Sequence, residues 1–257
     1  MIELVLIAIA GFFCGFFNTL ASSGAAVTLP LLIFWGMPLD IANGTNRLPI
    51  FVASCAAIVM FTREGAIHWP IAIKVVIPSL LGSLVGSIFA QTTSHRWLAI
   101  HITVSLLVSL ILLCTKMKDS LEIAIEEPPN IRLKELAILF MIGFWLGFIV
   151  LDGATFLMLT LILIIKLPFV HATAIKSLVL ASTSAVSIVL FAAHDNIDWG
   201  MGFILILGSI VGGVVGAKAV MAPMAKLWAY RLIMLVIFLE LLRLGARYFR
   251  DYESIVW

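Results

Sequence analysis

One stretch near the start of the chain decides the fold: Thr19-Leu20-Ala21-Ser22-Ser23-Gly24-Ala25-Ala26. It separates a long apolar segment at 3–20 from a short one at 24–36. Its serines and glycine interrupt a helix without introducing a charge. Non-helical backbone at membrane depth is tolerated only where protein buries it or where it lines a water-filled cavity. The stretch therefore predicts a helix break inside the protein, with a plain tight turn at a membrane surface as the alternative.

The composition of the whole chain places this break in a membrane protein. Of 257 residues, 63% are hydrophobic and only 12% are charged. A soluble domain is about 45–50% apolar and about 25% charged, and the few charges of this chain cannot cover a water-exposed surface. Disordered and disulfide-rich secreted proteins are excluded for the same reason.

The apolar segments predict an all-α polytopic membrane protein, because continuous runs of this kind do not fit the alternating strands of a barrel. Eight segments have about the length needed to cross the hydrocarbon core: 3–20, 41–62, 69–90, 97–115, 135–151, 170–193, 199–221 and 226–247. Two others, at 24–36 and 154–166, are short and occupy matching places.

An internal repeat accounts for this matching. An offset of 130 pairs Pro38 with Pro168, Trp69 with Trp199, Ser54 with Ser184, Gly82 with Gly212 and Gly86 with Gly216. Further upstream, an offset of 132 pairs Gly11 with Gly143 and Gly15 with Gly147, and these small-xxx-small pairs predict close helix packing. We expect two homologous halves, 1–115 and 135–250, of about four transmembrane helices each, with one short broken or re-entrant half-helix in each half and a cytoplasmic linker at 116–134.

The distribution of basic residues favours eight crossings, with the short segments re-entrant and with both termini and the linker in the cytoplasm. On this arrangement one side carries Arg63, Lys116, Lys118, Arg132, Lys134, Arg243, Arg247 and Arg250. Four crossings in each half would make the repeats parallel, whereas five would make them inverted.

The second half has a break that corresponds to the first, Leu151-Asp152-Gly153-Ala154-Thr155. Paired interruptions in two repeats are the best indication in a sequence of a transporter's central site. We therefore expect Ser22, Ser23, Gly24, Gly153 and Thr155 to contribute to a binding site.

Two cations lie about two turns into apolar segments, Arg47 in the first half and Lys176 in the second. Such a cation costs about 2.5–3.5 kcal/mol on insertion scales and is normally tied to function. Facing each other, the two would form a positively charged pocket for a small oxyanion, with uncharged donors from Asn43, Thr45, Asn46, Thr173 and Ser177. Snorkelling of both side chains to an interface is the alternative.

Asp152 is a lone acid between two apolar segments. It could carry a coupling proton, or it could be a permanent counter-ion for Lys176 or Arg47; the need of a desolvated cation for a partner favours the counter-ion.

The order of several motifs along the chain resembles one known family. A glycine-rich first helix runs into the small-residue break and then into a Pro-Leu-Leu segment. The next loop has the form Gly-x-Pro-x-x-x-Ala-x-Gly-Thr, here Gly36-Met37-Pro38-Leu39-Asp40-Ile41-Ala42-Asn43-Gly44-Thr45. Over essentially its whole length the chain is similar to the sulfite exporter TauE/SafE family of membrane permeases.

This resemblance implies a secondary transporter that moves small sulfur-containing or organic anions, such as sulfite or sulfoacetate, often outward across the cytoplasmic membrane of a bacterium. The chain departs from the family at two places. Serines stand at the first break, where a run of glycines is usual, and Asp152 stands at the second, where small neutral residues are usual.

Other functions are weaker alternatives. A passive anion channel of the same fold would share these features, and an intramembrane serine hydrolase would need Ser23 as nucleophile with His171 or His194 as base. The sequence has no Walker A, GxGxxG, CxxC or HExxH pattern, so we expect no enzyme activity, cofactor, metal or nucleic-acid partner. The expected partners are the small anion, the lipid bilayer and a coupling proton or sodium ion, and a homo-oligomer is left open.

Overall fold

The computed structural model describes residues 2–22, 24–92, 131–149, 151, 153–222, 224–225, 227–228 and 231. Every element of secondary structure within these ranges is a helix, which confirms the all-α prediction. The predicted segments 97–115 and most of 226–247 lie outside the described residues, as does most of the linker at 116–134.

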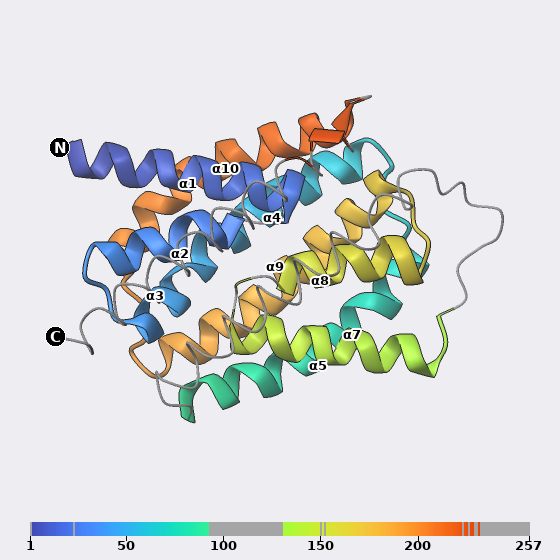
Figure 1. The fold of residues 1–257 in the computed structure, drawn as a ribbon, viewed down its shortest axis with the longest axis horizontal. Coiled ribbons are helices and arrows are strands. Elements are labelled where there is room, and N and C mark those ends of the chain that lie inside the picture. Colours follow the sequence, from blue (N-terminus) through green and yellow to red (C-terminus); the bar gives the residue numbers. More distant parts are fainter. Residues whose placement is uncertain are drawn as a thin grey trace, which may run out of the picture.

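The helices begin and end close to the predicted boundaries (Figure 1). They are α1 (Ile2–Ala21), α2 (Gly24–Phe34), α3 (Leu39–Thr45), α4 (Arg47–Arg63), α5 (Trp69–Thr92), α7 (Leu133–Phe148), α8 (Gly153–Leu159), α9 (Phe169–Ala192) and α10 (Trp199–Val220). A π-helix at Thr160–Ile164 continues α8. In the described part of the chain, five apolar helical stretches are long enough to cross a membrane: Glu3–Ala21, Leu39–Arg63, Trp69–Thr92, Phe169–Ala192 and Trp199–Val220.

Prolines set the start of corresponding helices in the two halves. Pro38 precedes α3 with φ −55° and ψ 148°, and Pro168 precedes α9 with φ −58° and ψ 150°. Each proline is the N-cap, and its carbonyl oxygen accepts the first hydrogen bond of the helix at 2.8 Å, from the N–H of Ala42 in α3 and of Ala172 in α9. These two prolines, which the sequence repeat pairs, therefore have the same backbone role.

The helices form two groups that run in opposite directions. In the first group α1 and α4 both run parallel to α10, because Gly11 and Gly15 lie against Leu205 and Ser209, and Leu48 and Ala53 lie against Gly202 and Gly213. In the second group α7 and α9 both run parallel to α5. The contacts with α7 are Ser79–Gly143 and Ser83–Gly147, and those with α9 are Ser83–Thr183 and Ser87–Ser187. The two groups are antiparallel to each other. Nδ1 of His171, at the start of α9, contacts the carbonyl oxygen of Ala66, just beyond the end of α4, so α9 begins where α4 ends.

These directions correct the predicted arrangement of eight crossings. That arrangement requires α1 and α4 to run in opposite directions, but they run the same way because α2 returns the chain to the side on which α1 begins (Figure 1). In the second half α8 likewise runs back along α7. The N-terminus and the start of α7 consequently lie at opposite ends of the bundle rather than on one cytoplasmic side. The observed directions are those of inverted rather than parallel repeats; the homology of the two halves stays a prediction.

Glycines bring the helices of each group close together. A Cβ on Gly82 or Gly86 of α5 would overlap the carbonyl oxygens of Phe140 or Phe144 in α7. A Cβ on Gly212 of α10 would likewise overlap the carbonyl oxygen of Phe12 in α1. Small residues permit such approach where lipid provides no hydrophobic drive between helices, so the predicted packing role of these motifs is confirmed.

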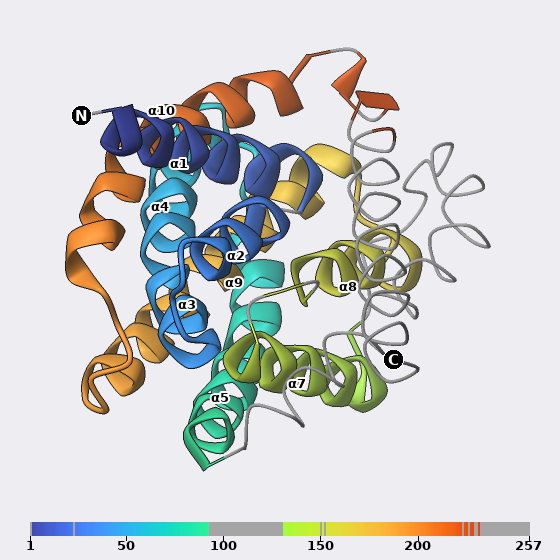
Figure 2. The same ribbon diagram turned by 60° about the vertical axis from the view of Figure 1, so that its left-hand side comes forward.

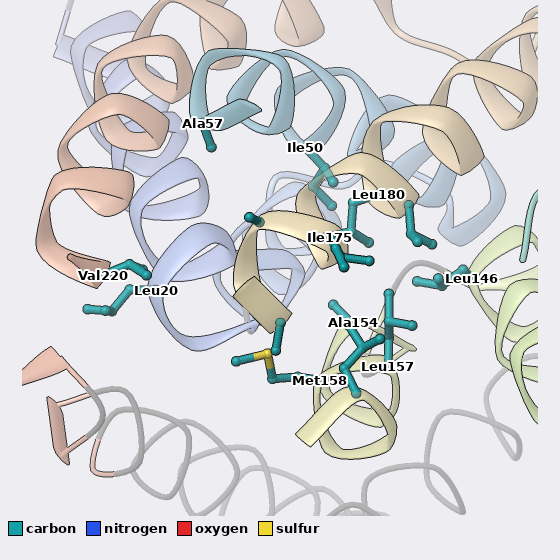
Figure 3. Close-up of a cluster of buried hydrophobic side chains, with 14 of the residues drawn as sticks. Leu20, Ile50, Ala57, Leu146, Ala154, Leu157, Met158, Ile175, Leu180 and Val220 are labelled. Carbon is teal, nitrogen blue, oxygen red and sulfur yellow. The ribbon is translucent and has the colours of Figure 1, made fainter. Parts of the chain in front are cut away.

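The interior is a mixture of apolar and polar side chains, and the exterior is apolar. Buried aliphatic residues such as Leu157, Ile175 and Leu180 fill the space between α8 and α9 and continue toward α1 and α4 (Figure 3). Helices α5 and α10 lie at the outside of the bundle (Figure 2). Large apolar residues of both helices are exposed: Leu81, Ile88, Phe89, Phe203, Leu207 and Val211. This distribution is that of a protein whose solvent is lipid.

Candidate functional site

Both predicted breaks are present. The first follows Ala21, where Ser22 takes a left-handed conformation with φ 60° before α2 begins at Gly24. The second follows Phe148, where Ile149 is extended with φ −139° before α8 begins at Gly153. Two of the predicted site residues, Ser23 and Asp152, lie outside the described residues.

The two breaks touch each other. The hydroxyl of Thr155, in the first turn of α8, donates a hydrogen bond of 3.4 Å to the carbonyl oxygen of Ser22. Both residues are buried. Two segments that are far apart in the chain are thus brought to one place.

Lys176 binds the first break. Its ammonium donates to the carbonyl oxygens of Asn18 at 2.8 Å and Thr19 at 3.0 Å, in the last turn of α1, and to the hydroxyl of Ser22 at 2.9 Å. An ammonium has three donors, so these three oxygens use all of them. The side chain is 0% exposed, and the cation lies at the negative end of the helix dipole of α1.

Arg47 binds the second break in the same manner. Its guanidinium donates to the carbonyl oxygens of Leu146 at 2.9 Å and Gly147 at 2.6 Å, in the last turn of α7. The Cζ atom lies 4.5 Å from the ring centroid of Phe191, at cation–π distance. Nε is buried without a hydrogen-bond partner among the described residues, and the side chain is 1% exposed.

The cations therefore do not snorkel, and each crosses to the opposite half of the chain. Instead of sharing one pocket directly, Arg47 holds the end of α7 and Lys176 holds the end of α1. The carbonyls that they bind, Asn18 with Leu146 and Thr19 with Gly147, are related by an offset of 128 along the sequence. Contacts of the glycines agree, because Gly212 lies against Phe12 and Gly82 against Phe140. The predicted upstream offset of 132 is thus one helical turn too long.

The remaining predicted donors do not converge on one point. Asn43 donates to the carbonyl oxygen of Phe148 at 3.1 Å and so belongs to the second break. Asn46 accepts a hydrogen bond from Thr28 of α2, and its amide nitrogen has no partner in the described part of the chain. The others bind elsewhere: Thr45 accepts from the Asp198 N–H, Thr173 donates to Phe169, and Ser177 donates to Thr173.

The two histidines considered as a catalytic base, His171 and His194, each contact a main-chain carbonyl oxygen. Nδ1 of His171 is 2.7 Å from the carbonyl oxygen of Ala66, and Nδ1 of His194 is 2.8 Å from that of Leu190. His171 lies at the start of α9 and His194 just beyond its end. Ser23, the nucleophile of the hydrolase alternative, lies outside the described residues.

Sequence reasoning missed a group of buried serines beside the second break. Ser87 of α5 donates to the carbonyl oxygen of Gly147 at 3.1 Å and lies 2.7 Å from the hydroxyl of Ser187 in α9. The sequence repeat contains an indication of them. It pairs Ser87 with Ala217 and Ser187 with Ala57, so the two hydroxyls are present in one half and absent at the matching positions of the other.

Comparisons with known proteins agree with these observations. The family model described as "Sulfite exporter TauE/SafE" matches residues 7–244. The chain is 28% identical over 223 residues to a "Probable membrane transporter protein" of Haemophilus influenzae, covering 85% of each chain. It is 24% identical over 219 residues to the "Probable membrane transporter protein YfcA" of Escherichia coli strain K12, covering 83% of this chain and 79% of the relative. No solved structure matches the chain.

A helical membrane bundle with two broken helices that meet, together with a family match over nearly the whole length, leads to one assignment. The chain belongs to the sulfite exporter TauE/SafE family of membrane transporters.

Proposed function

We propose that the protein is a secondary transporter that exports small sulfur-containing or organic anions, such as sulfite or sulfoacetate, across the cytoplasmic membrane of a bacterium. The anion binds where the two breaks meet, between the two halves of the chain. The description of the matching family supports the substrate class and the outward direction.

One observation carries the proposal: two buried cations are held by neutral oxygens. Within the described residues, all the hydrogen-bond acceptors of Lys176 and Arg47 are main-chain carbonyls or a serine hydroxyl. Carbonyl dipoles stabilise a cation without cancelling its charge, and desolvated charges interact strongly with an incoming ion. Among the described residues the charges of Arg47 and Lys176 are thus stabilised but not cancelled, which favours an anion at the site.

Binding of the anion would compete with these carbonyls for the same donors. An oxyanion oxygen makes shorter and stronger hydrogen bonds to guanidinium and ammonium groups than a neutral carbonyl does. Each donor that moves to the anion releases a carbonyl at the end of α1 or α7. Occupation of the site is thereby linked to the conformation of the breaks, as a transport cycle requires. Asp152 remains the proposed carrier of a coupling proton, or the counter-ion of the empty site.

Transport into proteoliposomes tests the proposal. Purified protein should move sulfite, and Arg47→Ala and Lys176→Ala should abolish this movement while Lys74→Ala, which changes an exposed lysine of α5, retains it. Uphill accumulation driven by a proton or sodium gradient would distinguish a secondary transporter from a passive channel. Sulfite flux at the wild-type rate in both Arg47→Ala and Lys176→Ala would refute the site.

A further inference from the structure

A chain of buried hydroxyls leads away from the second break. Ser87 and Ser187 are 2.7 Å apart, and Ser187 is 3.4 Å from Ser83. Ser83 also donates to the carbonyl oxygen of Thr183 at 3.3 Å. All three serine side chains are 0% exposed. They come from two helices, α5 and α9, which face the end of α7.

This group shares an acceptor with Arg47. The Ser87 hydroxyl and Nη2 of Arg47 donate to the same oxygen, the carbonyl of Gly147, at 3.1 Å and 2.6 Å. Because Ser87 donates there, its oxygen accepts from Ser187. Donors from two different helices therefore converge on one point, and Nε of Arg47 remains without a partner in the described ranges.

Close helix packing does not require these hydroxyls, as the other half of the chain shows. At the positions that the repeat pairs with Ser83, Ser87 and Ser187 stand Gly213, Ala217 and Ala57. Gly213 packs tightly against the backbone of Ala53 there, and all these residues are buried. The same kind of contact is thus made without a polar side chain. The two cation sites also differ, because every donor of Lys176 already has an acceptor.

We propose that Ser87 and Ser187, together with Arg47, form the subsite that selects anions with a three-oxygen head group over carboxylates; this inference rests on the proposed function. A guanidinium fork binds two oxygens of an anion. A carboxylate is then fully engaged, whereas sulfite or a sulfonate keeps a third oxygen, for which the serine hydroxyls on neighbouring helices are the donors.

Binding measurements on the purified full chain test this subsite. Thermal-shift titrations with sulfite, methanesulfonate and acetate compare the wild type with Ser87→Ala, Ser187→Ala and the double variant. Alanine is what the other half carries at both positions, so these variants should fold. Ser79→Ala is the matched control, since Ser79 is a buried serine of the same helix whose hydroxyl binds Val75 of its own helix at 2.9 Å.

We expect the double variant to lose about tenfold or more of its affinity for sulfite and methanesulfonate, the loss typical of one hydrogen bond to a charged group. Its affinity for acetate and that of Ser79→Ala for all three anions should stay unchanged. An equal loss for acetate, or an unchanged preference for sulfite, would overturn the subsite while leaving the transporter proposal intact. A wild-type protein that neither binds nor transports any of these anions would overturn both.

Discussion

Arg47 and Lys176 make matching hydrogen bonds in opposite directions across the molecule. Arg47, from the first half, binds the last carbonyls of α7, and Lys176, from the second half, binds the last carbonyls of α1. Each cation thus satisfies acceptors that a helix end leaves without an intrahelical donor. Because both contacts join the two halves, a movement that separates one half from the other must break both.

Loss of the ammonium of Lys176 should destabilise the protein. Lys176→Met keeps most of the length of the side chain but leaves the carbonyls of Asn18 and Thr19 without donors, at a cost of about 1–3 kcal/mol. Thermal unfolding in detergent measures the change, with Lys74→Met at an exposed position as the control. An unchanged or higher melting temperature would mean that burial of the ammonium costs as much as its hydrogen bonds contribute.

The glycine contacts between helices should not tolerate a methyl group. Gly82→Ala and Gly212→Ala place a Cβ on the backbone of α7 and α1, so each should lower stability by about 1–3 kcal/mol, as overpacking does. Gly200→Ala is the control, because its Cβ would have only one neighbour within 4 Å among the described residues, the Asp198 side chain at 3.3 Å. Equal melting temperatures for the three variants would contradict the close approach of these helices.

Asp198 should contribute to stability as a helix cap. Its carboxylate accepts a hydrogen bond of 3.0 Å from the N–H of Met201 at the start of α10. Asp198→Ala should therefore cost about 1 kcal/mol, and Asp198→Asn much less, since asparagine caps nearly as well. Thermal unfolding of the wild type and of both variants measures these changes. A melting temperature of Asp198→Ala equal to that of the wild type would exclude the cap.

The N-terminus and the linker should lie on opposite sides of the membrane. The end of the bundle at which α7 begins carries Arg63, Arg132 and Lys166, so the positive-inside rule places the linker in the cytoplasm and the N-terminus outside. The test places one epitope tag at the N-terminus and another after Pro129. Protease protection of each tag in intact spheroplasts shows on which side of the membrane it lies. Equal protection of both tags would restore the arrangement with both on one side.

Joining the two breaks should stop transport. A short bis-methanethiosulfonate reagent joins Ser22→Cys to Thr155→Cys through two reducible disulfides, in a background without the native cysteines. It holds together two segments that are hydrogen-bonded in this conformation. We expect sulfite flux in proteoliposomes to fall on cross-linking and to recover on reduction, whereas each single variant stays unaffected by the reagent. Full flux in the cross-linked protein would show that the breaks need not separate.

Much of the fold could be predicted because a membrane forces long uninterrupted apolar helices. The approximate bounds of α5, α9 and α10 follow from this alone, and both breaks follow from the serine, glycine and aspartate residues that interrupt the apolar segments. The direction of α2 could not be predicted, because it depends on which surface the short helix packs against. The sequence offset that pairs α1 with α7 in the repeat was predicted wrongly for a different reason. Gly-Phe pairs recur every four residues, at Gly11 and Gly15 and again at Gly143 and Gly147, so the offset of 132 pairs more glycines than the offset of 128 that the contacts show.

The candidate site was predictable in its residues but not in its contacts. A cation within an apolar segment is rare, which made Arg47 and Lys176 conspicuous. Their partners are main-chain carbonyls, which every residue carries, so no sequence pattern could identify Leu146 or Asn18. Ser87 escaped notice because a buried serine in a membrane helix commonly bonds its own backbone, as Ser79 does.

The pairing of α1 with α10 also determines how the protein can be made. A ribosome releases the glycine face of α1 first, but the backbone against which Gly11 and Gly15 pack, at Leu205 and Ser209, is among the last of the described helices to be synthesised. Until then the new chain must keep that face covered by lipid or by a translocation factor. Final assembly of the bundle therefore waits until α10 has been inserted.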